Sequence, residues 1–404
     1  MADLNGVFIV SPVSDWTAMR YANAALELRL QPTFLEISGS ESLSSSTGLS
    51  IITLSSFFEA AFAELAAVLA LSEFGGVVPG SELAVPFSNF LAAQLGLMRH
   101  HGDIMRFRDK SRMRETLSQG LVEQPEVLAL VKIGDELPKI DNTRYPVVIK
   151  PVNGVASMFV KKCTDSRELF AALKSYWECD NPQVGGIVFT KDVLIESYVE
   201  GSEYSIEVVV VNGVLKYCFV TQKILSEEPF FDEIGHVSLP ANDFPLQGAF
   251  RAFVQKVIAA LDFRTGVAHV EVRVDAYNNI RIIEIGARIA GDLISDSVQF
   301  AYGISLEREF LAAQSGLQLQ NQSETVSPSG VFGVKVIFED QLLNYKPADV
   351  EILKEKPLHF KELVEDVSPR HVLRRRKLQL FRAQSVEQAR RYVYGYDVLT
   401  TLPE

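Results

Sequence analysis

Two glutamates, Glu271 and Glu284, lie in a stretch whose pattern predicts a tight β-hairpin. Residues 268–275 alternate between apolar and polar side chains, as expected for a strand with two different faces. The turn-prone sequence Ala-Tyr-Asn-Asn follows, and a mostly apolar run at 280–285 then predicts the second strand. The two glutamates therefore fall on paired strands.

Counting outward from the turn gives the register of the hairpin. If Asp275 pairs with Ile280, Glu271 faces Glu284 directly. Directly opposed residues have Cβ atoms about 4.5 to 5.5 Å apart, and like charges there are destabilising. Two carboxylates at this separation suit one or two Mg²⁺ ions, which keep part of their shell for water and substrate phosphates. The alternative is a surface hairpin with a solvated glutamate face. The isoleucines around Glu284 argue against it, because they indicate burial and a buried carboxylate needs a partner.

Three further features suit a ligand that carries phosphate. Arg288, four residues after Glu284, offers a planar fork that matches phosphate geometry. Lys150 ends the valine-rich strand predicted at 145–150, where a buried ammonium needs a partner. The small-residue loop at 151–157 can bring backbone N–H groups close to phosphate oxygens, although an ordinary hairpin turn has the same composition.

The elements that must position these groups begin with a parallel α/β domain. A strand at 6–10, a helix at 16–30 and a strand at 32–37 form a βαβ opening. No GxGxxG motif follows the first strand, which argues against a Rossmann dinucleotide site. Helices are then predicted at 57–74 and 87–97, on either side of a short Gly-Val-Val-Pro-Gly segment.

The rest of the chain alternates strands and helices up to a change in composition near residue 315. In chain order the pattern predicts a helix from 110 to about 120 capped by Asp109, strands at 158–162, 193–198, 203–211 and 214–222, helices at 166–177 and 250–261, and a strand at 331–338. Asn212-Gly213 is a strong hairpin signal. A polar connector and a more charged tail follow the composition change, so we expect a separate small subdomain there.

Composition excludes several classes of function. The 404 residues allow two or three packed domains, and the net charge of −12 argues against a general attraction to nucleic acid or anionic membrane. The basic run at 370–377 is interrupted by apolar residues and is explained by a solvated face. Three scattered cysteines without a CxxC pair indicate a reducing compartment. No signal peptide or membrane span is evident, so we expect a cytoplasmic protein.

Taken in order, these motifs resemble those of the ATP-grasp superfamily, in particular its amino-acid (dipeptide) ligases, which are carboxylate–amine ligases. The resemblance covers roughly residues 76–291. It implies an α/β protein with α+β lobes in the ATP-grasp arrangement. The implied domains are an N-terminal parallel α/β domain at 1–108, a central lobe at 109–200 with a lid at about 145–195, a mainly antiparallel lobe with the metal site at 201–315, and an appended C-terminal subdomain at 316–404.

The resemblance implies a site for the ATP phosphates. Lys110, in the sequence Arg-Asp-Lys, and Lys150, in Tyr-Pro-Val-Val-Ile-Lys-Pro, match the two ATP-contacting lysines of the family. The loop that contains Asn153, Gly154 and Ser157 resembles the flexible lid over the phosphates. Taken alone, Lys110 could equally be a lysine on a helix surface.

The nucleoside is expected to bind to the segment LIESYVEGSEYSIE. By resemblance, Glu196 and the backbone of Tyr198 and Val199 contact the adenine edge, and Glu203 contacts the ribose. Each glutamate alone could be a solvated strand end. The occurrence of all these motifs in the family's order makes a chance match improbable.

At the hairpin, the resemblance assigns Glu271 and Glu284 as ligands of Mg²⁺, for which Mn²⁺ could substitute. Arg288 would hold the reacting phosphoryl or carboxylate oxygens. Many family members carry Asn two residues after the second metal glutamate, but this chain has Gly286 there. A third side-chain ligand is therefore not expected, and amino-acid ligases often have a small residue at this position.

The substrate pocket is expected near Glu233 and His236, which match a Glu and a His of dipeptide ligases. They would orient the amine substrate or accept its proton. The alternative for His236 is a loop histidine that makes one structural hydrogen bond. His269 lies on the glutamate face of its predicted strand and is a further pocket candidate. Asp292 could favour a positively charged substrate group, but a role as N-cap of the following helix is preferred.

The activity implied by the resemblance is ATP-dependent amide formation. A substrate carboxylate attacks the γ-phosphate to give an acylphosphate and ADP, and an amine then displaces phosphate. The expected partners are small amino-acid-like carboxylates and amines, with no nucleic acid or membrane, and a homodimer is one assembly the chain could form. Two alternatives stay open: an ATP-grasp carboxylase that uses bicarbonate, and a non-catalytic ATP-binding module, which has no need of paired metal carboxylates.

Overall fold

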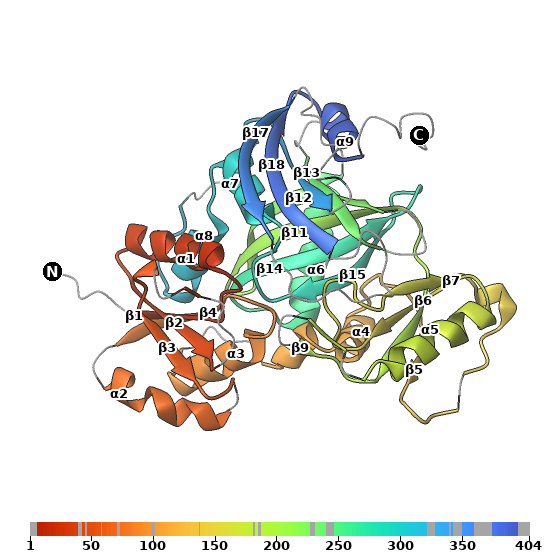
Figure 1. Ribbon diagram of the computed structural model, residues 1–404, viewed down its shortest axis with the longest axis horizontal. Helices are drawn as coiled ribbons and strands as arrows, with labels where there is room; N and C mark the ends of the chain where they lie inside the picture. Colours follow the sequence, from red (N-terminus) through yellow and green to blue (C-terminus); the bar gives the residue numbers. More distant parts are fainter. Residues whose placement is uncertain are drawn as a thin grey trace.

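The molecule is built from three lobes (Figure 1). They are an N-terminal α/β unit, a central α+β unit and a large sheet formed by the second half of the chain. The computed structural model describes residues 6–38, 43–44, 47–57, 59–70, 73–97, 102–136, 138–180, 182–184, 187–226, 231–239, 246–320, 328–338, 341, 350–358 and 374–394.

The N-terminal unit is a parallel sheet covered by helices, as the βαβ pattern predicts. Its strands lie in the order β3-β2-β1-β4, and every described pairing is parallel. Its elements are β1 (Gly6–Val10), α1 (Asp15–Glu27), β2 (Gln31–Ile37), β3 (Ile51–Leu54), η2 (Glu59–Leu65), α2 (Ala66–Leu69), β4 (Phe74–Pro79) and α3 (Val85–Gln94).

One prediction in this unit is wrong. The segment 57–74 does not form a single helix: it contains the 3₁₀ helix η2 and one short α-helical turn, and its end enters β4. The rings of Phe8 and Phe74 stack with centroids 3.8 Å apart, and β4 pairs with β1. Pairing with a strand distant in sequence therefore overrides the local helical pattern.

The central unit is a small antiparallel sheet in the order β5-β10-β6-β7. Asp109 caps its first helix as predicted, since its carboxylate accepts from the backbone N–H groups of Ser111 and Arg112. The elements are η3 (Ile104–Phe107), α4 (Lys110–Gln119), β5 (Val127–Val131), η4 (Asn142–Arg144), β6 (Val147–Pro151), β7 (Lys161–Cys163), α5 (Ser166–Glu178), β8 (Gln183–Val184), β9 (Ile187–Val188) and β10 (Val193–Ser197).

The second half of the chain forms one antiparallel sheet. Among the described residues it has eight strands, in the order β15-β14-β11-β12-β13-β16-β18-β17. The predicted Asn212-Gly213 turn joins β11 to β12, and both residues have the positive φ that such a turn requires. The elements are β11 (Ser202–Val211), β12 (Val214–Leu225), β13 (Glu233–Ser238), α6 (Gln247–Leu261), β14 (Gly266–Val274), β15 (Ile280–Gly286), α7 (Ile294–Tyr302), α8 (Leu306–Gln314), β16 (Val331–Phe338), β17 (Glu351–Pro357), β18 (Arg375–Ala383) and α9 (Val386–Tyr394).

The strands after residue 316 continue this sheet. β16 pairs with β13 on one side and with β18 on the other, and β17 pairs with β18. The predicted domain boundaries remain predictions. The last strands nevertheless share their backbone hydrogen bonds with the lobe before them, so the polar connector does not separate two sheets.

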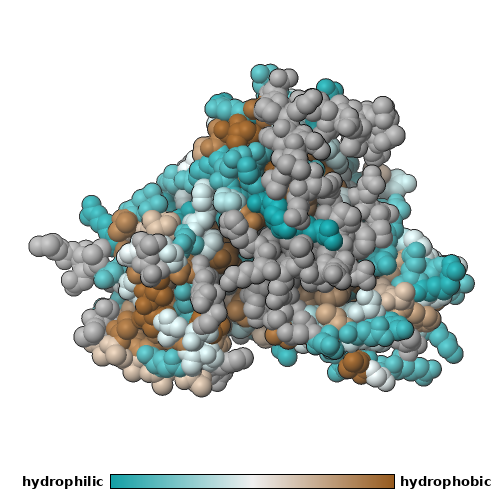
Figure 2. All heavy atoms as spheres, viewed as in Figure 1, coloured by the Kyte–Doolittle hydropathy of each residue, from teal (hydrophilic) through white to brown (hydrophobic). Residues whose placement is uncertain are grey.

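The surface is unevenly apolar on the face shown in Figure 2. Hydrophilic side chains cover the outer end of the central unit, and hydrophobic ones gather over the N-terminal unit. No helix in the described part of the chain is long and apolar enough to cross a membrane.

Candidate active site

One cavity collects most of the side chains that the sequence singles out. It has a volume of about 700 Å³ and is lined by all three lobes, a size typical of small-molecule sites. The predicted residues on its wall are Lys110, Lys150, Gly154, Ser157, Glu196, Tyr198, Val199, Glu203, Glu233, Glu271, Glu284 and Arg288. His269 and Asp292 also line it, whereas Asn153 and His236 lie outside this set.

The two glutamates of the β14–β15 hairpin are directly opposed, as predicted. The register near the turn is nevertheless one residue away from the prediction, because Val274, not Asp275, pairs with Ile280. A β-bulge between positions 271 and 272 shifts the ladder by one residue and restores the opposition of Glu271 and Glu284. Bulges of this kind re-aim side chains beside functional sites.

Each of these glutamates uses only one carboxylate oxygen within the described structure. Oε1 of Glu284 lies 2.8 Å from Nζ of Lys110. Oε1 of Glu271 lies 2.9 Å from Nζ of Lys223 and 3.1 Å from Nε2 of His269. Among the described residues, no hydrogen bond reaches Oε2 of either glutamate. The side chain of Glu271 is 18% exposed and that of Glu284 is 33% exposed, and both line the cavity.

His269 links the hairpin to a buried acid on β11. Its Nδ1 lies 2.7 Å from Oε1 of Glu207, and its Nε2 faces Glu271. Burial by itself would lower the pKa of His269, but the two carboxylates outweigh burial and raise it to about 10. His269 is therefore a charged partner of Glu271 at neutral pH. Burial alone would raise the pKa of Glu271, but the nearby Lys223 and His269 hold it well below its usual range.

Lys150 belongs to a buried ion triad that the sequence does not reveal. Its Nζ lies 2.5 Å from Oε2 of Glu196, whose other oxygen accepts from Nε of Arg114 at 2.6 Å. Burial alone would raise the pKa of Glu196, yet the two cations hold it at about 2. The same Arg114 donates from Nη2 to the carbonyl of Ile283, inside the bulged segment, at 2.8 Å. One arginine thus connects the predicted adenine-site glutamate to the hairpin.

Lys223, on β12, is the second cation that the sequence analysis missed. Its ammonium lies 2.8 Å from Glu203, 2.8 Å from Glu233 and 2.9 Å from Glu271. Burial by itself would lower its pKa, but the three carboxylates raise it well above the usual value. Lys223 therefore joins the predicted ribose, substrate and metal residues in one ionic network.

The predicted nucleoside pocket has an aromatic and cationic wall. Arg273 donates from Nε to Glu203 at 2.9 Å and from Nη1 to the carbonyl of Val199 at 2.8 Å. Its guanidinium carbon lies 5.3 Å from the ring centroid of Tyr198 and 5.0 Å from that of Phe231. Such stacking of arginine on aromatic rings contributes favourably when the cation is desolvated.

The small-residue loop after β6 is not a simple two-residue hairpin turn. Ala156, Ser157 and Phe159 all have positive φ, a left-handed conformation that costs free energy in residues other than glycine. Strain of this kind concentrates at ligand-binding loops. Lys110 fixes the loop to α4, since its Nζ donates to the carbonyl of Gly154 at 2.7 Å. The side-chain oxygen of Asn153 instead accepts from the backbone N–H of Thr190 at 2.8 Å, which turns it away from the cavity.

Arg288 is held by an acid from the N-terminal unit. Its Nε lies 2.5 Å from Oε2 of Glu82, and Oε1 of Glu82 lies 2.9 Å from Nη1 of Arg108. Gly286 leaves the space that this pair needs, since a Cβ atom there would lie 3.1 Å from Oε2 of Glu82. The glycine is thus explained by the position of Glu82, which a larger side chain would displace.

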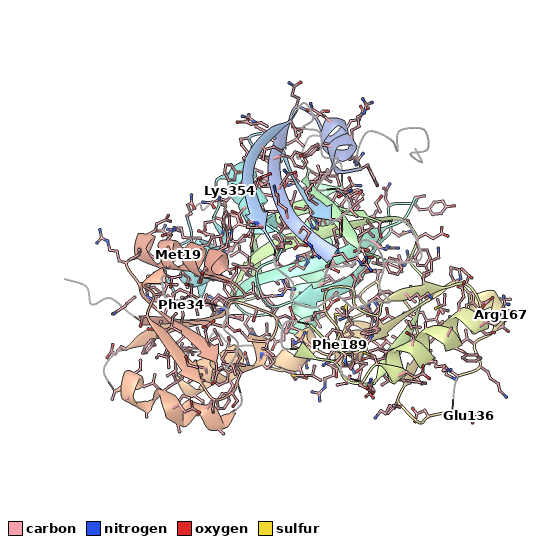
Figure 3. The ribbon with its side chains drawn as sticks, in the orientation of Figure 1. Met19, Phe34, Glu136, Arg167, Phe189 and Lys354 are labelled. Atoms are coloured by element: carbon pink, nitrogen blue, oxygen red, sulfur yellow. The ribbon has the colours of Figure 1, made fainter. Side chains whose placement is uncertain are left out.

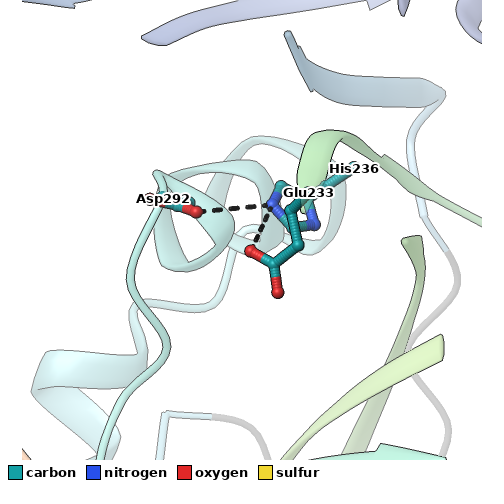
Figure 4. A group of neighbouring side chains, drawn as sticks. All are labelled: Glu233, His236 and Asp292. Atoms are coloured by element: carbon teal, nitrogen blue, oxygen red, sulfur yellow. Dashed lines mark ion pairs between the residues drawn. The ribbon is translucent and has the colours of Figure 1, made fainter. Parts of the chain in front are cut away.

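Glu233, His236 and Asp292 lie close together (Figure 4), and the two acids, which line the cavity, also lie beside Arg375 of β18. Nε2 of His236 lies 3.7 Å from an oxygen of each acid, and neither ring nitrogen has a hydrogen-bond partner in the described structure. Their ligand atoms all lie within 4.8 Å of one another, a spacing that could hold a cation. Nη1 of Arg375, however, already lies 2.5 Å from Asp292. The group therefore fits the positioning of a polar substrate better than a metal.

The predicted capping role of Asp292 is wrong. α7 begins at Ile294, and the residue in the N-cap position, Leu293, makes no side-chain cap. Asp292 and Leu293 both have positive φ, so the chain turns and the carboxylate points to Arg375. Burial alone would raise the pKa of Asp292, but the arginine holds it far below its usual range.

Known proteins share part of this sequence and its fold. Residues 143–296 match the family model of the ATP-grasp domain. A curated relative, D-alanine–D-alanine ligase A of Bacillus cereus, is 29% identical over 133 residues, which are 32% of this chain. The chain spans only 37% of the length of that relative.

Solved structures show the same fold over nearly the whole chain. The L-amino acid ligase from Bacillus licheniformis superposes with a TM-score of 0.73 at 21% identity, covering 96% of both chains. The N5-carboxyaminoimidazole synthetase from Staphylococcus aureus superposes with a TM-score of 0.65 at 14% identity, again covering 96% of both. At these identities the likeness concerns the fold.

Proposed function

We propose that this chain, which carries an ATP-grasp domain, is an ATP-dependent ligase that joins a small carboxylate to an amine. The observation that carries the proposal is the arrangement around one cavity of two opposed glutamates, two lysines and an arginine. Glu271 and Glu284 face each other across the hairpin, and Lys110, Lys150 and Arg288 line the same space. Such a set suits phosphoryl transfer, in which positioning and charge neutralisation supply most of the catalysis.

The residues present fit a divalent cation. Oε2 of Glu271 and Oε2 of Glu284 accept no hydrogen bond from the described groups, and hard carboxylate oxygens are the ligands that Mg²⁺ prefers. When bound there, Mg²⁺ or Mn²⁺ would neutralise charge on the phosphates of ATP. Gly286 adds no third side-chain ligand, so the remaining positions would be left to water and substrate oxygens.

The chain's own cations supply the other contacts to the phosphates. The ammonium groups of Lys110 and Lys150 are buried on the cavity wall, so each acts in a medium where charge is poorly screened. Burial, the largest influence, lowers the pKa of Lys150, and Glu196 opposes it. The loop around Ser157, which lines the cavity, would cover the triphosphate and exclude water from the acylphosphate.

The nucleoside fits the wall formed by β10 and β11. Glu203 would accept from the ribose hydroxyls, and Tyr198, Val199 and Glu196 would surround the adenine. Because Glu196 is paired with two cations, its main effect on adenine would come through the position of the strand.

The reacting carboxylate would be held by Arg288. Burial by itself lowers the pKa of this arginine, but Glu82 outweighs burial, so the guanidinium stays a cationic donor. Glu233 and His236 lie next to Lys223 and Arg375, where they would orient the amine and hold its proton. Amino acids and short peptides supply both groups and match the size of the cavity.

The test is phosphate release from ATP by the purified protein with pairs of amino acids. We expect release only with certain pairs, only with a divalent cation, and in step with an amide product seen by mass spectrometry. Bicarbonate-dependent ADP formation without any amine would indicate a carboxylase instead. ATP binding without phosphate release under every mixture would overturn the proposal and favour a binding module.

A further inference from the structure

The cavity extends beyond the proposed phosphate contacts to a second, charged region, which adjoins Glu233 and His236 through Asp292 and Arg375. Its wall there comes from the start of α1, the segment before and within α7, and strands β17 and β18. We call this region the distal end and define it by six residues of the cavity wall: Trp16, Arg20, Asp292, Asp296, Lys356 and Arg375. The strands β17 and β6, which carry Lys356 and Lys150, lie far apart in the molecule (Figure 1).

The acids of the distal end are matched with cations. Asp292 pairs with Arg375 at 2.5 Å. Asp296 lies 2.6 Å from Arg20 and 3.0 Å from Lys354. Arg20 also forms a two-pronged ion pair with the neighbouring Glu307. Each of these carboxylates therefore has a cation in contact.

Lys356, by contrast, makes no ion pair with a described residue. In the described part of the chain, no carboxylate or carbonyl lies within ion-pair or hydrogen-bond distance of its ammonium group. Lys354 and Lys356, two residues apart on β17, face the same side, whereas Glu355 between them points to the other side and pairs with Lys377. Nζ of Lys354 lies 5.2 Å from the ring of Trp16 on α1, and Lys356 lines the cavity, so this side of β17 faces α1 and the cavity. Figure 3 labels Lys354 on β17 and Met19 on α1.

Two N–H groups at the distal end also have no hydrogen-bond acceptor within the described structure. Nε of Arg375 and Nε1 of Trp16 are buried and have no hydrogen-bond partner in the described structure. Burial, the largest influence, lowers the pKa of Lys356, and Asp292 and Asp296 only oppose it. An unpaired cation in a partly desolvated place is costly unless a ligand supplies the opposite charge.

We infer that Lys356 binds a carboxylate group of the substrate at the distal end, so that the preferred substrate carries an anion there. This inference deepens the proposed ligase function and rests on it. The carboxylate could be the α-carboxylate of an amino acid or a side-chain carboxylate, and the experiment below separates the two. Lys356 would be a specificity residue, remote from phosphoryl transfer.

The experiment measures binding by calorimetry, in the presence of Mg²⁺ and a non-hydrolysable ATP analogue. The probes are L-glutamate, L-glutamine, which lacks the side-chain carboxylate, and L-glutamic acid α-amide, which lacks the α-carboxylate. The variants are Lys356→Met, which keeps the length of the side chain without the charge, and Lys356→Arg, which keeps the charge. Lys377→Met is the matched control, because Lys377 lies on the adjacent strand, pairs with Glu355 and is outside the cavity wall.

We expect the wild-type protein to bind glutamate about tenfold or more tightly than one of the two amides. Lys356→Met should abolish that preference, and Lys356→Arg and Lys377→Met should keep it. Preference over glutamine identifies a side-chain carboxylate, and preference over the α-amide identifies the α-carboxylate. A wild-type protein that binds all three alike would overturn the inference. So would a Lys356→Met variant that still prefers the acid.

Failure of the proposed function gives a different result. In that case phosphate release is absent with every pair of substrates, while the binding preference and its loss in Lys356→Met can still be measured. Conversely, wild type and Lys356→Met could both catalyse ligation with the same ratio of the KM for acid substrates to the KM for amide substrates. That result would leave the ligase assignment intact and remove the role of Lys356.

Discussion

Replacing Glu196 by glutamine removes the centre of the buried ion triad and should destabilise the central unit. Glu196 is 1% exposed and contacts both Arg114 and Lys150. The substitution keeps the shape of the side chain but leaves two buried cations without an anion, a change that typically costs about 3 to 5 kcal/mol. The pKa of Glu196 gives a similar figure, because it falls from 4.5 to about 2 on folding. Since each pKa unit corresponds to about 1.4 kcal/mol, the shift contributes about 3 kcal/mol to the free energy of unfolding at pH 7.

The pH dependence of this loss follows from the direction of the shift. The pKa of Glu196 is depressed in the folded protein, so its contribution is complete above 4.5 and disappears as the pH falls towards 2. Glutamine does not titrate. The difference in unfolding free energy between wild type and Glu196→Gln should therefore shrink from about 3 kcal/mol at pH 7 to about 2 kcal/mol near pH 3.5.

The measurement is urea unfolding followed by the fluorescence of Trp177, which packs on the core of the central unit. A Trp16→Phe background removes the only other tryptophan. Glu178→Gln is the matched control, because Glu178 is 66% exposed and its ion pair with Lys174 should contribute less than about 0.5 kcal/mol. A loss below about 1 kcal/mol at pH 7, or one that does not change with pH, would refute the reasoning.

Three other substitutions test the remaining parts of the site. Glu284→Gln should lower cation-dependent phosphate release about 100-fold or more and leave the circular dichroism spectrum unchanged. A variant with full activity would show that Glu284 is not a metal ligand. Gly286→Ala should push Glu82 by a few tenths of an ångström and raise the KM for the carboxylate substrate without changing that for ATP; equal effects on both would contradict the contact. Lys223→Met leaves three carboxylates without their common cation and should cost about 3 kcal/mol or more in urea unfolding, whereas Lys223→Arg should cost less.

Local features of the chain could be predicted from the sequence. The β14–β15 hairpin follows from alternation and a short turn, and the cap of α4 follows from one aspartate before a helical pattern. Even there, Glu271 faces Glu284 only because of a β-bulge, which counting residues outward from the turn does not predict. A bulge is set by contacts from elsewhere, here the bond from Arg114 to the carbonyl of Ile283, 169 residues away in the chain.

The residues that the sequence did not reveal are those whose partners lie far along the chain. Lys223 is 48 residues from Glu271, Arg114 is 82 from Glu196, and Glu82 is 206 from Arg288. A buried strand lysine such as Lys223 carries a signal, since a cation in an apolar run needs an anion, but the signal does not name the partner. The place of the last strands depends on distant partners in the same way: the pairing of β16 with β13 joins them to the sheet before the polar connector, and the predicted subdomain at 316–404 stays a prediction.

Part of the distal end comes from the outer segments of the chain, α1 and the strands β17 and β18, and part from the segment before and within α7, whereas the proposed lysine contacts to the triphosphate lie on α4 and β6. Selection can therefore act on the two regions separately. If Lys356 binds the substrate as proposed, changes in β17 would alter which compound is accepted without touching the proposed phosphate contacts Lys110 and Lys150. A chimaera that exchanges only β17 (Glu351–Pro357) would then change the accepted substrate and keep the proposed phosphate contacts.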